Sequence, residues 1–149
     1  RMGELQADRP RLLRRMQGAL AQMATTKTAA MGFCFGGKAV LDLARAGETD
    51  GVVSLHGLYD RPPFDTGTMP PVLLCHGWQD PLAQPDAFAA MAAELEDHCA
   101  DWHALALGGT GHAFTNPTQA DSVPGMGYVE ASARRSWQAV DAFLSDVLL

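Results

Sequence analysis

The sequence predicts an α/β fold in which parallel strands alternate with helices. Short apolar segments alternate with longer amphipathic ones along most of the chain. Two strands joined through a helix pair in parallel, because the chain crosses back over the sheet before the next strand begins. The length of 149 residues and the apolar content of 47% are typical of one packed domain. We therefore expect a single α/β domain over residues 1–149.

The first part of the chain is predicted to form a helix, a strand and a second helix. Asp8 is a candidate N-cap and Pro10 lies in the first turn of a helix with regularly spaced apolar residues. Residues 28–33 are predicted to form a short buried strand. The helix that follows covers residues 36–46 and ends at Gly47, a residue type that readily adopts the left-handed conformation of a helix C-terminus.

The rest of the chain continues this alternation. Strands are predicted at residues 51–56, 72–76 and 102–107, and each is followed directly by glycine. A helix is predicted to begin at Pro85, between the last two strands. Residues 116–127 are rich in Pro, Gly and Ser, which indicates a surface loop.

The last predicted helix covers residues 130–148. Its apolar residues recur at helical spacing, so one face is predicted to pack on the sheet. The residues expected on this face are Ala133, Trp137, Val140, Leu144 and Val147.

Composition excludes several classes of function. The net charge of −6, without segments that interleave basic and aromatic residues, argues against nucleic acid as a partner. No apolar run approaches the ~18 residues of a membrane span, and no signal-peptide core is present. Three cysteines without a secretory signal favour free thiols in a reducing compartment, so we expect a cytoplasmic location. No spacing of ligating residues is typical of a metal site, and neither a metal nor a cofactor is expected.

Charge is distributed unevenly along the chain. Residues 1–45 hold eight Lys/Arg and three Asp/Glu, whereas residues 46–149 hold three and fourteen. Either the two parts attract one another, or these charges lie on solvated helix faces. The second interpretation is favoured, because solvated faces hold most charged residues.

The strongest local pattern surrounds Cys34, between a predicted strand and a predicted helix. It is typical of a nucleophile elbow, written with Cys in place of Ser. Gly32 and Gly36 are expected to avoid collisions in the sharp turn. The thiol lies at a helix N-terminus, which favours the thiolate. The amide of Phe35 points to where an oxyanion forms.

A base and an orienting acid follow later strands. Asp80 comes after strand 72–76, and His112 comes after strand 102–107. Because the carboxyl ends of parallel strands meet at one edge of a sheet, Cys34, Asp80 and His112 are expected to meet there as a triad. Taken singly, each has an alternative. Cys34 suits a buried position, Asp80 suits an N-cap of the helix that begins at Pro85, and His112 suits a structural loop position.

Other residues near this edge have weaker patterns. His56 and His76 each end a strand, where a structural or supporting role is favoured. Cys75 and Cys99 are predicted to be packing residues. Three aromatic residues either line an apolar pocket or pack beneath the loops: Tyr59, Trp78 and Phe114.

Three blocks of the sequence together resemble the dienelactone hydrolase family. They are residues 32–37 (GFCFGG), 76–80 (HGWQD) and 111–114 (GHAF), and the resemblance extends from about residue 4 to the C-terminus. It implies an α/β-hydrolase fold that acts on lactones and small esters through a Cys–His–Asp triad.

Carried over residue by residue, the resemblance assigns a role to each candidate. Cys34 would be the nucleophile, His112 the general base, and Asp80 the acid that orients it. Phe35 would supply one oxyanion-hole amide. The expected substrate-binding residues are Phe35, Tyr59, Trp78 and Phe114.

One departure from the family concerns the region before the elbow. The family fold has further strands and helices there, which supply a second oxyanion-hole amide. We therefore expect the C-terminal portion of the fold, with four predicted strands and flanking helices. Strand 28–33 would form an open apolar edge, covered by a companion N-terminal segment or by a second copy of the chain.

The expected function is hydrolysis of a small ester or lactone through an acyl-thioester on Cys34. Activated phosphoesters are a further expected substrate class. The alternative is an inactive fragment or a binding module built on a hydrolase remnant. The reactivity of the Cys34 thiol distinguishes the two.

Overall fold

A computed structural model describes residues 2–23, 26–119 and 123–149. Its four strands are β1 (Ala29–Phe33), β2 (Gly51–Leu55), β3 (Val72–Gly77) and β4 (Trp102–Leu107). Its helices are α1 (Met2–Ala7), α2 (Arg9–Leu20), α3 (Phe35–Ala46), α4 (Pro85–His98) and α5 (Glu130–Leu148).

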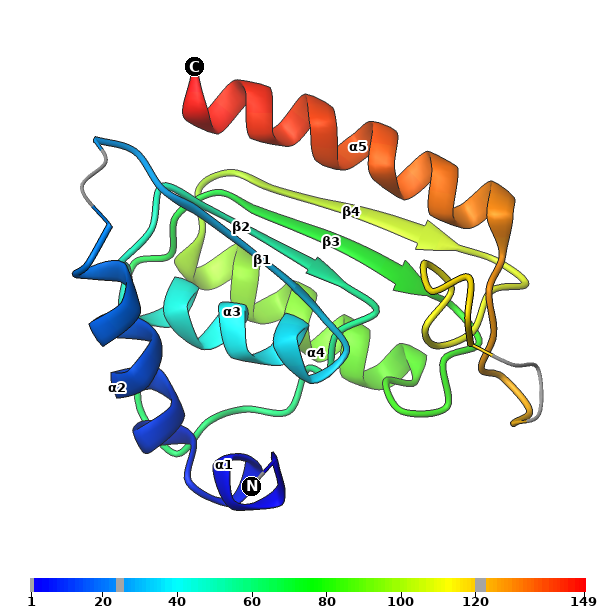
Figure 1. The fold of residues 1–149 in the computed structure, drawn as a ribbon, viewed down its shortest axis with the longest axis horizontal. Coiled ribbons are helices and arrows are strands. Elements are labelled where there is room, and N and C mark those ends of the chain that lie inside the picture. The colour runs from blue at the N-terminus through cyan, green and yellow to red at the C-terminus, as the bar shows by residue number, and fades with distance from the viewer. Residues whose placement is uncertain (1, 24–25, 120–122) are drawn as a thin grey trace.

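The four strands form one parallel sheet in the order β1-β2-β3-β4, as predicted. Every residue of β2 and β3 is buried, whereas β1 and β4 are the edges. At the β1 edge, Met31 is 41% exposed and Phe33 is 39% exposed. All strands run in the same direction, so the segments that follow β1, β3 and β4 lie at one end of the sheet (Figure 1).

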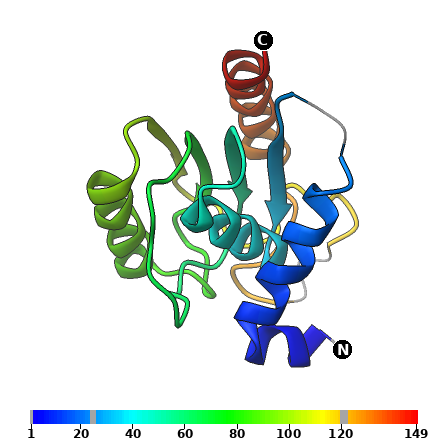
Figure 2. The same ribbon diagram turned by 90° about the vertical axis from the view of Figure 1, so that its left-hand side faces the viewer.

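The sheet lies between two layers of helix. Helices α3 and α4 cover one face and α5 covers the other (Figures 1 and 2). Because side chains alternate along a strand, Val52 packs on the α3 and α4 side whereas Val53 packs on the α5 side. Two core clusters result, one on each face of the sheet.

Helix ends form where the sequence indicates them. The carboxylate of Asp8 accepts a hydrogen bond from the backbone amide of Arg11 and so caps α2. Gly47 ends α3 in the left-handed conformation, at φ 71°. The short helix α1 was not predicted. In the described part of the chain, no helix is long and apolar enough to cross a membrane.

Helix α5 corrects one prediction. Ala133 and Val140 are buried as expected, but Trp137 is 39% exposed and Leu144 is half-buried. The buried stripe runs through Ser136 and Val140, and Trp137 lies about 100° around the helix from Ser136. Trp137 therefore lies at the border of the stripe rather than inside the core.

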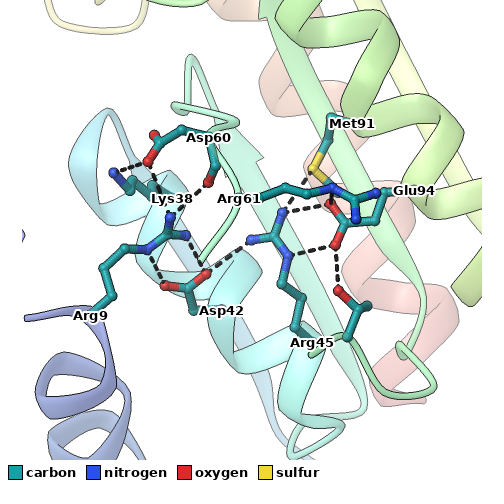
Figure 3. A network of polar contacts seen from close by, with 9 residues as sticks. Arg9, Lys38, Asp42, Arg45, Asp60, Arg61, Met91 and Glu94 are labelled. Atoms are coloured by element: carbon teal, nitrogen blue, oxygen red, sulfur yellow. Dashed lines mark hydrogen bonds and ion pairs between the residues drawn. The ribbon is translucent and has the colours of Figure 1, made fainter. Parts of the chain in front are cut away.

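A buried ionic network joins α3 to α4 and α2 (Figure 3). The Arg45 guanidinium donates two hydrogen bonds of 2.8 Å to the carboxylate of Glu94 and one of 2.9 Å to Asp42. Arg9 donates to both oxygens of Asp42, at 2.6 Å to Oδ1, which Arg45 also contacts, and at 2.9 Å to Oδ2. The hydroxyl of Thr66 donates to Glu94 at 2.6 Å. These contacts satisfy the two buried carboxylates from several sides.

The network also bears on the uneven distribution of charge. Three cations of the basic N-terminal part bind carboxylates of the acidic part: Arg45 binds Glu94, and Arg9 and Lys38 bind Asp60. The solvated-face interpretation is therefore wrong for Arg45 and Glu94, which are each about 1% exposed, whereas the Asp60 side chain is 59% exposed. Here the two parts of the chain do attract one another.

Candidate active site

Cys34 occupies a sharp turn between β1 and α3. Its backbone has φ 53° and ψ −119°, a conformation that residues other than glycine seldom adopt. Two contacts hold it. Its amide donates to the carbonyl of Leu55 in β2 at 3.1 Å, and its carbonyl accepts from the amide of Lys38 at 3.3 Å. The predicted nucleophile elbow is therefore present.

Glycines make this turn possible, although not the pair that was predicted. A Cβ at Gly32 would overlap the carbonyl oxygen of Gly36. A Cβ at Gly37 would lie 2.6 Å from the Ser54 hydroxyl and 2.8 Å from the Cα of Gly57. A Cβ at Gly36 meets nothing outside its own helix, so the prediction of a collision there is wrong. The turn instead needs Gly32 and Gly37.

His112 and Asp80 form a buried pair. The Nδ1 of His112 lies 2.7 Å from Oδ2 of Asp80, and the two residues are 3% and 1% exposed. The other oxygen of Asp80 accepts from the amide of Leu82 at 2.8 Å. The N-cap of α4 is Gln84, so the alternative role of Asp80 as that cap is wrong.

Close backbone contacts fix the loop that carries His112. A Cβ at Gly77 would overlap the carbonyl oxygen of Gly111, and a Cβ at Gly111 would overlap that of Gly125. The amide of His112 donates to Gly125 at 2.7 Å, and its carbonyl accepts from Gly127 at 3.1 Å. These glycines allow the loops after β3 and β4 to meet, which brings Asp80 and His112 together.

The thiol and the imidazole change one another's proton affinity. A hydrogen bond with His112 lowers the pKa of Cys34, and the nearby Phe35 amide lowers it further, against the opposing effect of burial. Burial alone would lower the pKa of His112, but its hydrogen bonds with Asp80 and Cys34 raise that pKa to about 9. These contacts therefore favour transfer of the proton from the Cys34 thiol to the His112 imidazole.

A cavity of 540 Å³ opens beside the thiol and the imidazole. Cys34 and His112 both line it. Ten further described residues of its wall come from β1, α5 and the loops at the carboxyl end of the sheet: Phe33, His56, Leu82, Ala113, Thr115, Asn116, Pro117, Gln119, Met126 and Trp137.

The four predicted substrate-binding residues are not among the described residues that line this cavity. Tyr59 and Phe114 are core residues, 5% and 0% exposed, so the interpretation of packing beneath the loops holds for both. Trp78 is 45% exposed and lies against the ring of Phe88 instead. Phe35 is half-buried at the start of α3, where its amide faces the thiol.

His56 lies directly beside the candidate triad. Its ring is 5.1 Å from that of His112 in an edge-on arrangement, and its Nε2 hydrogen-bonds the Thr115 hydroxyl at 2.8 Å. Burial and the charge of His112 lower the pKa of His56 to about 4, so its ring is neutral near neutral pH. His56 therefore supports the wall of the cavity and does not compete with His112 for a proton.

The remaining candidates pack in the core. His76 stacks on Phe88, with ring centroids 4.7 Å apart. Cys75 is buried, and burial raises its pKa to about 11. The Cys99 thiol donates to the carbonyl of Pro70 at 3.1 Å. These positions agree with the structural and packing roles that the sequence favoured.

Sequence reasoning missed most of the residues that line the cavity. Phe33 was assigned to a buried strand, and Trp137 to the core face of the last helix. Periodicity indicates which face of an element is apolar, but it does not show where that face reaches a cavity. The position of Phe33 directly before Cys34 was the one available signal.

The parallel sheet, the elbow and the buried His–Asp pair at its carboxyl end define the α/β-hydrolase class. The structure therefore confirms the expected fold. Within that class, the chain belongs to the dienelactone hydrolase family, whose sequence model matches residues 2–148. The Caenorhabditis elegans protein K02A2.1 is 32% identical over 127 residues, which cover 80% of each chain.

Two solved structures are similar in both sequence and fold. The dienelactone hydrolase-like promiscuous phosphotriesterase P91 from metagenomic libraries is 35% identical, with a TM-score of 0.86 over 97% of this chain. The structure named m3DLH is 33% identical, with a TM-score of 0.85 over 98% of this chain. In each case this chain spans 65% of the length of the other.

Proposed function

We propose that the protein hydrolyses small carboxylic esters and lactones, with Cys34 as the nucleophile. The observation that carries the proposal is the strained elbow that holds the Cys34 thiol beside a His112 imidazole already paired with Asp80. Membership of the dienelactone hydrolase family supports the same reaction class.

The first half of the proposed reaction is acyl transfer to sulfur. The Cys34 thiolate attacks the carbonyl carbon, a C–S bond forms, and the carbonyl electron pair moves onto oxygen. The Phe35 amide, which already lowers the pKa of the thiol, stabilises this oxyanion. As the oxyanion collapses, the C–O bond breaks and the leaving alcohol takes the proton from the His112 imidazolium.

The second half releases the acid. His112, now neutral, accepts a proton from a water molecule as that water attacks the thioester carbonyl. Collapse of the second oxyanion breaks the C–S bond, and the carboxylic acid leaves. The Cys34 thiolate and the His112 imidazolium are restored. Asp80 holds the imidazole ring in the same orientation through both halves, at 2.7 Å.

The test is turnover of 4-nitrophenyl acetate by the wild type and two cysteine variants. Cys34→Ala is expected to reduce hydrolysis to the uncatalysed rate. Cys75→Ala is the matched control, because Cys75 lies inside β3 with a pKa raised to about 11, and it is expected to retain activity. A wild type no faster than Cys34→Ala would contradict the proposal and favour the binding-module alternative.

Activated phosphotriesters are a second proposed substrate class. The relative P91 is described as a promiscuous phosphotriesterase. The Cys34 thiolate that attacks the carbonyl carbon of an ester would here attack the tetrahedral phosphorus of a phosphotriester. We expect a dialkyl aryl phosphotriester to be hydrolysed more slowly than the aryl ester, and only when Cys34 is present. Release of the aryl alcohol by wild type and Cys34→Ala at equal rates would contradict this expectation.

The open edge of β1 belongs to the same proposal, because Met31 and Phe33 are exposed there. A further strand, from a companion segment or from a second copy of the chain, would pair with the free backbone amides and carbonyls of this edge. Size-exclusion chromatography with intact masses distinguishes the two sources. A monodisperse monomer of 15.9 kDa would contradict the second copy and, when no other chain is present, the companion segment as well.

A further inference from the structure

Two aromatic side chains stand at the mouth of the catalytic cavity. Phe33 directly precedes the nucleophile, and Trp137 approaches from α5 on one face of the sheet. Their ring centroids lie 6.0 Å apart with the planes tilted by 53°, and each residue is 39% exposed. Both therefore present aromatic surface to a molecule bound beside Cys34, although neither is needed to fill the core.

The rest of the wall is apolar or neutral. Leu82 and Met126 add aliphatic surface. The Thr115 hydroxyl is held at 2.8 Å by the ring of His56, which is uncharged near neutral pH. Among the described residues that line the cavity, none is Lys, Arg, Asp or Glu. On the described part of the wall, the groups that can carry charge near neutral pH are thus those of Cys34 and His112.

The catalytic residues carry a net negative charge. Whether the shared proton lies on Cys34 or on His112, these two residues together are neutral, and the carboxylate of Asp80 leaves a net charge of −1. An anionic substrate would enter against this charge, and the described wall offers it no cation other than His112, which is already paired with Asp80. The anion would also lose its hydration. A neutral molecule is not repelled by this charge, and its loss of hydration costs less.

We propose that the cavity selects neutral esters that carry an aromatic ring, with the ring held against Phe33 and Trp137 and the ester group beside Cys34. Aromatic rings gain from tilted or edge-on contacts with other rings beyond the simple burial of area. This substrate class rests on the proposed ester hydrolysis, but the selectivity belongs to the cavity and is measurable without turnover.

The experiment uses the Cys34→Ala protein and three matched esters. Phenyl acetate carries the neutral ring, cyclohexyl acetate has a saturated ring of similar size, and 4-acetoxybenzoate adds a carboxylate to the aromatic ring. NMR titration gives a Kd for each. We expect phenyl acetate to bind at least about tenfold more tightly than 4-acetoxybenzoate and about threefold more tightly than cyclohexyl acetate.

Two tryptophan variants in the Cys34→Ala background locate the site. Trp137→Leu is expected to weaken phenyl acetate binding about tenfold and to reduce the preference over cyclohexyl acetate. Trp78→Leu is the matched control, because Trp78 is similarly exposed at 45% but does not line the cavity. We expect it to change that Kd less than about twofold. Urea unfolding verifies that both variants are folded.

Three results would overturn the inference: equal binding of phenyl acetate and 4-acetoxybenzoate, equal binding of phenyl acetate and cyclohexyl acetate, or equal effects of the two tryptophan substitutions. The proposed hydrolysis has a separate readout. If the Cys34→Ala protein shows the expected selectivity while the wild type turns over no ester, the proposed hydrolysis is wrong and the proposed selectivity of the cavity stands. If the wild type hydrolyses 4-nitrophenyl acetate but the selectivity is absent, the proposed selectivity is wrong and the proposed hydrolysis stands.

Discussion

Replacing Arg45 by methionine is expected to lower the free energy of unfolding by about 3–5 kcal/mol near neutral pH. The substitution keeps an unbranched side chain of similar length but removes three hydrogen bonds of 2.8–2.9 Å. Asp42 keeps its contacts with Arg9. Glu94 keeps the Thr66 hydroxyl and a distant Arg61 at 3.9 Å, so it becomes a buried, poorly compensated charge. This loss is the main source of the expected cost.

The protonation of Glu94 gives a second measure of the same interaction. Burial alone would raise its pKa, but the bonds from Arg45 and Thr66 lower it from 4.5 to about 2. A shift of this size corresponds to about 3 kcal/mol. Because the pKa is lowered on folding, this stability is present above pH 4.5 and is lost as the pH falls toward about 2. The difference between wild type and Arg45→Met is therefore expected to shrink over that interval.

Urea unfolding followed by circular dichroism measures both effects. The midpoint is expected to fall for Arg45→Met without a change in slope. Arg45→Met combined with Glu94→Met removes both charges and is expected to be more stable than Arg45→Met alone, since no unpaired carboxylate remains there. A cost below about 1 kcal/mol, as for a surface ion pair, or a cost independent of pH, would refute the reasoning.

Other predictions concern the elbow and the triad. Gly32→Ala is expected to disrupt the turn and the reactivity of Cys34, because its Cβ overlaps the Gly36 carbonyl, whereas Gly36→Ala is expected to fold with unchanged or slightly greater stability. Urea unfolding of the two variants compares them, and equal stability would contradict the glycine assignment. In the Cys34→Ala background, Asp80→Asn is expected to bring the pKa of His112 down toward its ordinary 6.5, since the pairing carboxylate charge is lost. NMR titration of the His112 ring measures this shift, and an unchanged pKa would show that Asp80 does not hold the imidazolium.

The candidate triad was predictable because its signals are local. A glycine-rich turn marked Cys34 at a strand end, and the parallel topology placed Asp80 and His112 at the same edge. The strands and most helices were predictable for the same reason, because hydrophobic periodicity and the Gly and Pro residues at element ends can be read from short stretches of sequence. The roles of the three residues stay predictions until activity is measured.

The burial and the long-range contacts of several residues were not predictable, because they depend on how the elements pack together. Phe114 follows His112 on a loop, yet it points into the core with 0% exposure. Trp137 has the spacing of a core residue, yet it lies at the border of the buried stripe. Arg45 pairs with Glu94 across 49 positions of sequence, and only the placement of α4 beside α3 makes that contact. Sequence patterns indicate faces and turns but not which faces meet.

The pH dependence of alkylation at each cysteine tests the central claim most directly. Iodoacetamide labelling, followed by peptide mass spectrometry, gives a separate rate for Cys34, Cys75 and Cys99. We expect Cys34 to titrate below the ordinary thiol value of 9.0 and to react fastest at neutral pH, while Cys75 stays protected by a pKa raised to about 11. Cys34 labelling with a midpoint at or above 9.0, no faster than that of Cys99, would contradict an activated nucleophile at the elbow.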